Sequence, residues 1–164
     1  SLSLLNMKII FDIETDGFLQ NLTKIHCFAT FEIEKKESKS FKKNLIKGIE
    51  YLESADLLIG HNILKFDIPA IKKIYNFNPK AEIFDTLEYA RRIWPKIIES
   101  DNKEDRIPIE YRGRHSLKAW GYRLSNFKGD YNGPWTVYSE EMMKYCIQDV
   151  NVTYELWKKI QSHL

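Results

Sequence analysis

The stretch KIIFDIE at residues 8–14 decides the fold, because it alternates with the two-residue period of a β-strand. Ile9, Phe11 and Ile13 take one face of this predicted strand. Asp12 and Glu14 fall on the other face, so both carboxylates point the same way. The first strand therefore carries two acids on a single side.

Outward from this strand, the pattern predicts a sheet with helices. Residues 23–34 alternate as a second strand and residues 38–41 as a short third, which gives a three-strand antiparallel meander. Helical spacing over 45–52 precedes an apolar strand at 57–60, and helical spacing over 68–75 precedes a strand at 82–84. We predict an α/β fold in which helices flank five strands, the meander and two more.

The C-terminal half is predicted to be mostly helical. A helix over 86–94 is followed by residues 96–114, which have no clear period and are interpreted as a functional or mobile loop, and then by a short helix over 116–124. A long helix begins after Ser139, with a predicted core stripe of Met143, Ile147, Val150, Tyr154 and Trp157. Tyr145 and Asp149 then lie one turn apart on a neighbouring face.

Length and composition limit the class of protein. The 164 residues suit one domain, which we place at 7–164, with residues 1–6 before Met7 interpreted as a leader or cloning remnant. No apolar run approaches the roughly 18 residues of a membrane helix, so we expect a cytoplasmic protein without a membrane partner. Cys27 and Cys146 lack metal-binding spacing and are interpreted as reduced core residues. A net charge of +2 favours a polyanionic partner only weakly.

Four features could together hold a metal: Asp12-x-Glu14, His61-Asn62, Asp67 and Tyr145-x3-Asp149. Each also has an ordinary interpretation, as a solvated strand edge, a helix N-terminal acid or a core aromatic. Unpaired carboxylates in a sheet covered on both faces carry a large desolvation cost, which a cation would offset. Oxygen ligands suit Mg²⁺ or Mn²⁺ better than zinc, and these cations indicate a phosphate substrate.

The order of these motifs resembles the DnaQ-like (DEDD) exonucleases of the ribonuclease H-like fold, in the branch with tyrosine in the third motif. The matching motifs are FDIET at 11–15, HN at 61–62 through FD at 66–67, and YCIQD at 145–149. HSLKAWGYRLSNFKGDY at 115–131 and residues 139–153 are similar to the proofreading domain of family A DNA polymerases of podophages. The resemblance covers nearly all of residues 7–164.

The resemblance implies a function and a role for each motif residue. Asp12, Glu14, Asp67 and Asp149 would hold two Mg²⁺ ions, with Mn²⁺ as a substitute. Glu14 and the Tyr145 hydroxyl would orient the attacking water, so the catalytic set is Asp12, Glu14, Asp67, Tyr145 and Asp149. Phe18 and Leu19 would contact the terminal base, and His61 and Asn62 would lie near the substrate.

A basic segment at 112–130, in which aromatic residues are interleaved, is the candidate for backbone contacts with a single strand. Arg112, Arg114 and Lys128 are its predicted nucleic-acid contacts, although a solvated helix face explains such a run equally well. The expected activity is 3′-to-5′ removal of nucleotides from single-stranded or frayed DNA. RNA as substrate, a non-catalytic binding module, an endonuclease, and a polymerase partner in cis or in trans all stay open, as does the oligomeric state.

Overall fold

The computed structural model describes residues 6–127 and 129–164, and within them the chain forms one mixed sheet of five strands. The strands are β1 (Lys8–Thr15), β2 (Ile25–Glu32), β3 (Glu37–Phe41), β4 (Leu57–Gly60) and β5 (Glu82–Asp85). Their order is β3-β2-β1-β4-β5; β2 is antiparallel to β1 and β3, whereas β4 is parallel to β1 and β5. The predicted α/β fold, a three-strand meander plus two parallel strands, is confirmed.

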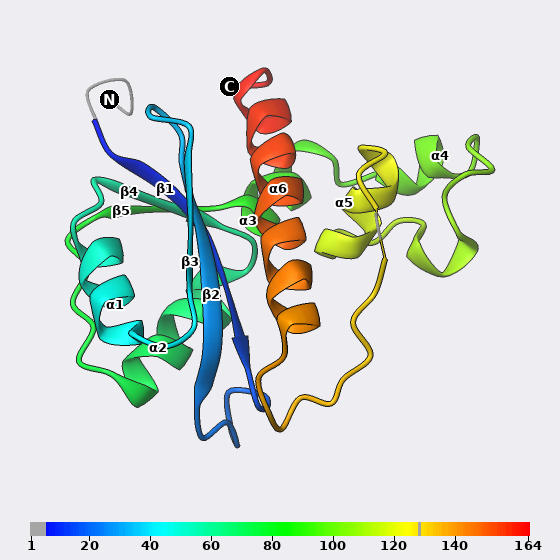
Figure 1. The fold of residues 1–164 in the computed structure, drawn as a ribbon. Helices are drawn as coiled ribbons and strands as arrows, with labels where there is room; N and C mark the ends of the chain where they lie inside the picture. The colour runs from blue at the N-terminus through cyan, green and yellow to red at the C-terminus, as the bar shows by residue number, and fades with distance from the viewer. Residues whose placement is uncertain (1–5, 128) are drawn as a thin grey trace.

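Helices cover both faces of the sheet (Figure 1). They are α1 (Leu45–Glu53), α2 (Ile68–Ile74), α3 (Thr86–Ile93), α4 (Ile97–Asp101), α5 (Leu117–Arg123) and α6 (Glu140–Gln161), with a π-helical turn at Ile63–Asp67 and a 3₁₀ turn at Ile109–Tyr111. One hydrophobic cluster joins the sheet to α1 and α2, and a second joins it to α3 and α6. Each face of the sheet is therefore buried.

The central strand β1 divides its side chains between these two clusters. Ile9, Phe11 and Ile13 pack in the cluster with α1 and α2, as the two-residue period predicts. Asp12 and Glu14 lie on the opposite face, beneath α6. Because α6 covers this face, the two carboxylates are withdrawn from bulk water, which is costly for charged groups without partners.

Helix α6 buries a different stripe from the predicted one. Ile147 is 39% exposed, whereas Cys146 is fully buried and its thiol lies 3.2 Å from the backbone oxygen of Asp12. The buried residues of the helix are Met142, Met143, Cys146, Val150, Val152, Thr153, Leu156 and Ile160. The prediction of Ile147 as core was wrong. Helix α6 packs against β1 and β2 as well as α3 and α5, so its buried face is broad. Where α6 contacts β1, the smaller Cys146 faces the strand.

Residues 96–114 are more ordered than the predicted irregular loop. They contain α4 and the 3₁₀ turn, and Asp101 pairs with Arg123 of α5 at 2.7 Å. Arg106 donates to the carbonyl oxygens of Tyr122 and Arg123, at 2.5 and 3.0 Å. Asp101 and Arg106 thus form these bonds with residues outside the segment. The order of the segment depends on these distant contacts, so its own sequence shows no hydrophobic periodicity.

Two other expectations concern the ends and the membrane. Residues 1–5 of the predicted leader lie outside the described residues. In the part of the chain that is described, no helix combines the length and apolar character needed to cross a bilayer.

Candidate active site

The predicted catalytic residues gather around one cavity of about 290 Å³. Its lining includes Asp12 and Glu14 from β1, Asp67 from the π-helical turn, and Tyr145 and Asp149 from α6. These residues are up to 137 positions apart in the chain, from 12 to 149. The fold therefore brings together all five residues of the predicted catalytic set.

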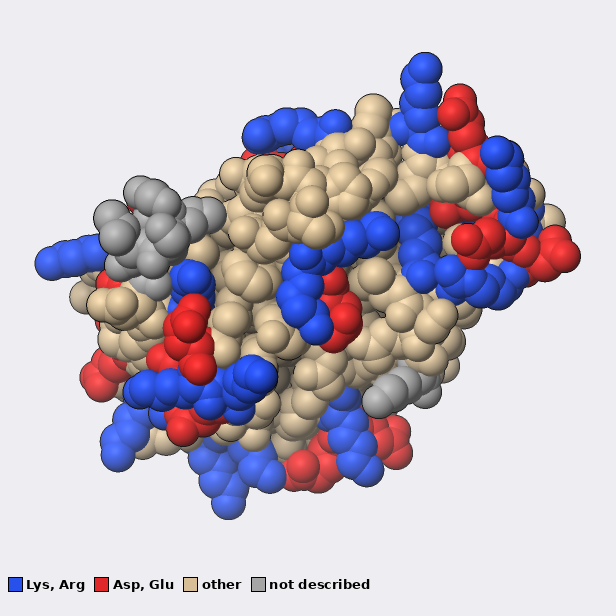
Figure 2. Space-filling view, turned by 90° about the horizontal axis from the view of Figure 1, so that it is seen from above, with Lys and Arg blue, Asp and Glu red and all other residues tan. Residues whose placement is uncertain are grey.

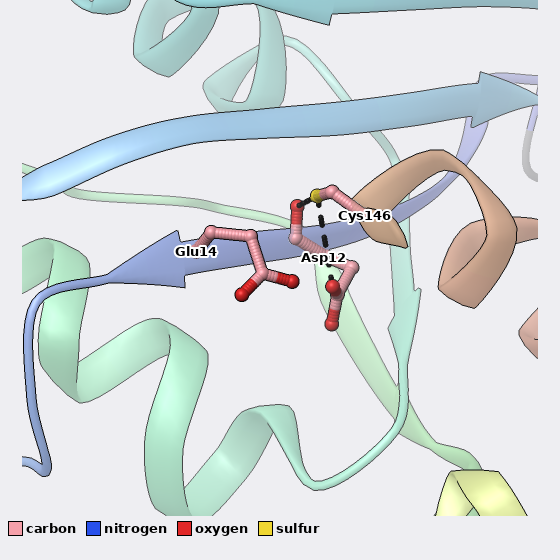
Figure 3. A group of neighbouring side chains, drawn as sticks. All are labelled: Asp12, Glu14 and Cys146. Atoms are coloured by element: carbon pink, nitrogen blue, oxygen red, sulfur yellow. Dashed lines mark hydrogen bonds between the residues drawn. The ribbon is translucent and has the colours of Figure 1, made fainter. Parts of the chain in front are cut away.

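Asp12 and Glu14 form the tightest part of this group. Figure 3 shows their side chains on the same side of β1, with Cys146 of α6 beside Asp12. A carboxylate oxygen from each acid and the Cys146 sulfur all lie within 4.8 Å of one another. The thiol is 3.6 Å from Asp12 Oδ2 and 3.2 Å from its backbone oxygen. The Cys146 thiol thus contacts both the backbone oxygen and the carboxylate of Asp12.

Burial makes ionisation of these acids unfavourable in the metal-free protein. Burial, followed by repulsion from Asp12 and Asp149, raises the pKa of Glu14 to about 11. Burial, followed by repulsion from Asp67, raises the pKa of Asp12 well above its usual range, and burial does the same for Asp149. Among the described residues, no Lys or Arg pairs with any of the four carboxylates. An oxygen-only set of this kind fits hard dications, which would supply the missing positive charge.

Asp67 does not act as an ordinary helix cap. Its side chain makes no capping bond to α2, and Oδ2 instead accepts a hydrogen bond from the Ile13 amide at 3.2 Å. Asp67 is only 3% exposed, and burial raises its pKa to about 8. The alternative interpretation as a helix N-terminal acid does not describe this carboxylate, which is fixed to β1 between the two other acids.

Tyr145 lies in the wall of the cavity with its phenol protonated. Burial, with repulsion from Asp149 as the next cause, raises the pKa of Tyr145 above its usual range. Its ring is 6.3 Å from the ring of Tyr131, measured between centroids. A protonated hydroxyl can donate a hydrogen bond, so Tyr145 is suited to positioning a water or phosphate oxygen.

The second motif is shaped by a residue outside the predicted site, Asp85. Asn62 adopts a left-handed backbone conformation, with φ of 64°. Asp85 accepts the Asn62 and Leu64 amides at 2.9 and 3.1 Å, and it also caps α3 through the Leu87 amide. His61 uses Nδ1 on Thr86 and Nε2 on the His115 carbonyl, so neither ring nitrogen is free for a substrate.

The two predicted base contacts after the first motif lie in different surroundings. Phe18 is 78% exposed and lines a second cavity that shares Glu14 and Asn62 with the acid cavity. Leu19 instead packs against the core cluster of α1 and α2, and its carbonyl accepts from Lys73 at 2.9 Å. Of these two residues, Phe18 is the one that lines the cavity.

Most cations of the basic segment are engaged inside the protein. Arg112 donates to the Ile107 carbonyl at 2.9 Å, Lys118 pairs with Asp130, and Arg123 pairs with Asp101. Arg112 is therefore already engaged by the local structure, and its contact with nucleic acid stays a prediction. Arg114 is exposed and lines a groove beside His61, while Lys128 lies outside the described residues. Figure 2 likewise shows Lys and Arg mixed with Asp and Glu on the face in view.

Trp135 is a site residue that the sequence analysis missed. It is 38% exposed and, with Phe66, lines both the acid cavity and the cavity of Phe18. Its carbonyl accepts a bond from His26 Nε2 at 2.6 Å, and its ring meets Tyr131 edge-on. The segment before α6 has no secondary structure, so only an exposed aromatic in a polar stretch could have signalled it.

Comparison with known families agrees with the fold. A model of the RNase H superfamily matches residues 9–161, nearly the whole chain. The chain belongs to the RNase H superfamily. This RNase H superfamily member is also 29% identical over 188 residues to the DNA-directed DNA polymerase of Escherichia phage T7. That match covers 94% of this chain and 26% of the polymerase, so the chain spans about a quarter of its relative.

The fold of this chain is similar to those of several solved nucleases. NrnC of Brucella melitensis with bound Mg²⁺ has a TM-score of 0.62 at 17% identity, covering 94% of this chain and 72% of NrnC. An E. coli ExoI–ssDNA complex with zinc bound has a TM-score of 0.59 at 14% identity, covering 96% and 41%. At these identities the likeness establishes the shared fold.

Proposed function

We propose that this chain is a metal-dependent 3′-to-5′ exonuclease that releases nucleoside 5′-monophosphates from DNA 3′ ends, preferring single-stranded or frayed ends. The observation that carries the proposal is the convergence of Asp12, Glu14, Asp67, Asp149 and Tyr145 on one cavity. Glu14 and Asp67 are buried and Asp12 and Asp149 are half-buried. Four crowded carboxylates without a basic partner among the described residues are costly to keep, and a catalytic metal centre explains why they are together.

The donor set supports two Mg²⁺ ions, with Mn²⁺ as a substitute. Asp12, Glu14 and Asp149 would hold one ion, and Asp12 and Asp67 would hold the second. Such ions, when bound, stabilise negative charge on the attacking and leaving oxygens at phosphorus. The presence of Mg²⁺ in the structurally similar NrnC supports this choice of metal.

The protein side chains then position the reactants. The Tyr145 hydroxyl, protonated throughout the neutral range, donates a hydrogen bond that orients the attacking water. Glu14 accepts a hydrogen bond from the same water. Phe18 supplies an apolar surface for the terminal base at the edge of the cavity. Alignment of the water with the scissile phosphate is the main contribution of these groups.

DNA is the proposed substrate because of the relatives. The chain matches part of a phage DNA polymerase, and ExoI was solved with single-stranded DNA on the same fold. The same relationship supports a polymerase as partner, on the same chain or on another. Since one fold hosts many activities, RNA is the alternative substrate that a test must separate.

The decisive experiment is a time course with DNA and RNA oligonucleotides labelled at either end, with and without Mg²⁺. A 3′-to-5′ exonuclease gives a descending ladder from the 5′-labelled DNA and releases a labelled mononucleotide at once from the 3′-labelled strand. If RNA were digested faster than DNA, RNA would be the substrate of the proposed exonuclease. Cleavage of circular single strands would indicate an endonuclease instead.

A non-catalytic binding module is tested separately by calorimetric titration with Mg²⁺. The exonuclease proposal expects metal binding that is lost in Asp12→Asn, because Asp12 lies between the other acids. Nucleic-acid binding without metal binding or digestion would contradict the proposal.

A further inference from the structure

A groove lined by two arginines adjoins the acid cavity. It has a volume of about 570 Å³, and its lining includes Arg91 at the end of α3 and Arg114 after the 3₁₀ turn. His61 and Asn62 line both this groove and the acid cavity, and Asn62 also lines the cavity of Phe18. Among the described residues, the linings of the Phe18 cavity and the groove have only Asn62 in common, whereas the acid cavity shares further residues with each of them, so the acids lie between the two.

The two ends of this surface differ in charge and in chemistry. The end with Phe18, Phe66 and Trp135 carries Glu14 and Asp16, and none of its described lining residues is Lys or Arg. The arginine groove has no Asp or Glu in its described lining. Aromatic faces suit a base, whereas guanidinium groups suit phosphates. A strand that crosses the acids would thus find a base site at one end and a phosphate site at the other.

Arg91 is free to bind an anion in this groove. Within the described residues its guanidinium takes part in no hydrogen bond or ion pair, and the same holds for Arg114. Burial lowers the pKa of His61 to about 4, and the nearby charge of Arg91 adds to that lowering. His61 therefore stays neutral beside Arg91 in the lining of the groove and adds no charge to it.

The next residue offers a contrast. Arg92 is also exposed in the last turn of α3, but its guanidinium lies 5.2 Å from the centroid of the Tyr89 ring and does not line the groove. Arg91 and Arg92 thus carry the same charge and lie on the same helix, but only the Arg91 side chain lines the groove. This pair gives a matched control for a test of the groove.

We propose that Arg91, together with Arg114, binds the backbone phosphate next to the scissile phosphate on its 5′ side, so that the continuing strand leaves the acids through the arginine groove. The terminal nucleotide then lies toward Phe18 and Trp135. The proposal rests on the proposed exonuclease function, and it fixes the direction of the strand across the site. A continuing strand needs its phosphates neutralised, whereas the single terminal nucleotide needs mainly a stacking surface.

The test compares Arg91→Gln with Arg92→Gln in first-cut, steady-state assays on a 5′-labelled single strand. Loss of one charge-assisted contact is expected to raise KM about tenfold in Arg91→Gln and leave kcat nearly unchanged. Arg92→Gln is expected to behave as wild type. Arg91→Lys keeps the charge and should restore part of the affinity. Equal KM values for the two glutamine variants would overturn the proposal.

Strands with a single neutral methylphosphonate locate the contact. Placed at the second linkage from the 3′ end, the neutral group should raise the wild-type KM and remove the difference between wild type and Arg91→Gln. Placed several linkages further along, it should leave that difference intact. The reverse pattern would overturn the proposed position of the strand.

Binding measured in EDTA separates this proposal from the function on which it rests. By fluorescence anisotropy, Arg91→Gln should reduce the slope of log affinity against log salt by about 0.7, the value for one phosphate contact on a single strand. Binding that depends on Arg91, without any digestion, would overturn the exonuclease function but support phosphate binding in the groove. Digestion with normal binding by Arg91→Gln would overturn the groove alone.

Discussion

The acid cavity and the basic segment at residues 112–130 satisfy their charges in different ways. In the cavity, Asp12, Glu14, Asp67 and Asp149 are crowded together without a basic partner among the described residues. In the basic segment, Arg112, Lys118 and Arg123 already have partners inside the protein. Charges that the fold leaves unsatisfied identify a binding site better than charges that merely cluster in the sequence.

The largest expected effect comes from neutralising the cavity. Asp12→Asn should lower the rate of Mg²⁺-dependent digestion about a thousandfold or more, because several kcal/mol of charge stabilisation at phosphorus depend on the metals. Asp105→Asn, an exposed acid away from the cavity, is the matched control and should digest normally. If Asp12→Asn digested DNA within tenfold of the wild-type rate, the unpaired acids of the cavity would not be the catalytic site.

The next effect concerns stability and the basic segment. Arg123 and Asp101 have side chains only 7% and 2% exposed, so Arg123→Met should leave a buried carboxylate unpaired and cost about 3 kcal/mol in the free energy of unfolding. Arg114→Gln, whose guanidinium has no internal partner among the described residues, should change stability by less than about 0.5 kcal/mol. Urea denaturation of both variants measures the difference. Equal stabilities would mean that both arginines are surface charges.

A smaller effect is expected for Tyr145→Phe, which keeps the ring and removes the hydroxyl. Because the hydroxyl positions the water, kcat should fall about tenfold with little change in KM. Tyr131→Phe, on a ring that contacts Tyr145 without belonging to the predicted catalytic set, is the control. Should kcat stay at the wild-type value in Tyr145→Phe, the tyrosine would only pack in the wall.

A further effect is a change of stability with pH in the metal-free protein. The pKa of Asp67 is about 8 and that of Glu14 about 11, against roughly 4 in an unfolded chain. Raised acid pKa values contribute stability that is full below about pH 4 and is lost as the pH rises through the folded pKa values. Thermal unfolding in EDTA should therefore show Tm falling from pH 5 to pH 9.

Added Mg²⁺ provides the check on this last prediction. The increase in Tm on adding Mg²⁺ should grow with pH, because protons and cations compete for the same oxygens. Asp12→Asn should weaken both the pH dependence and the response to Mg²⁺. A Tm that is flat with pH would show that neither burial nor mutual repulsion raises the pKa values of these acids in the folded chain.

The sequence predicted the strands of the sheet and the faces on which the acids and Tyr145 lie, because both follow from local patterns. The two-residue period of residues 8–14 places Asp12 and Glu14 on one face of a strand, whatever packs above it. The four-residue step from Tyr145 to Asp149 likewise holds for any helix. Residues 96–114 could not be predicted in this way, since the partner of Asp101 is Arg123, 22 residues away.

What the sequence by itself determined was therefore the face of each element on which the acids lie and the order of the motifs. Tertiary structure alone decided which charges have partners. It buried Cys146 and exposed Ile147 on α6, tied Arg112 to carbonyls, and brought Trp135 to the edge of the acid cavity. The physical reason is that backbone periodicity is fixed over a few residues, whereas the partner of a long side chain depends on packing between distant segments.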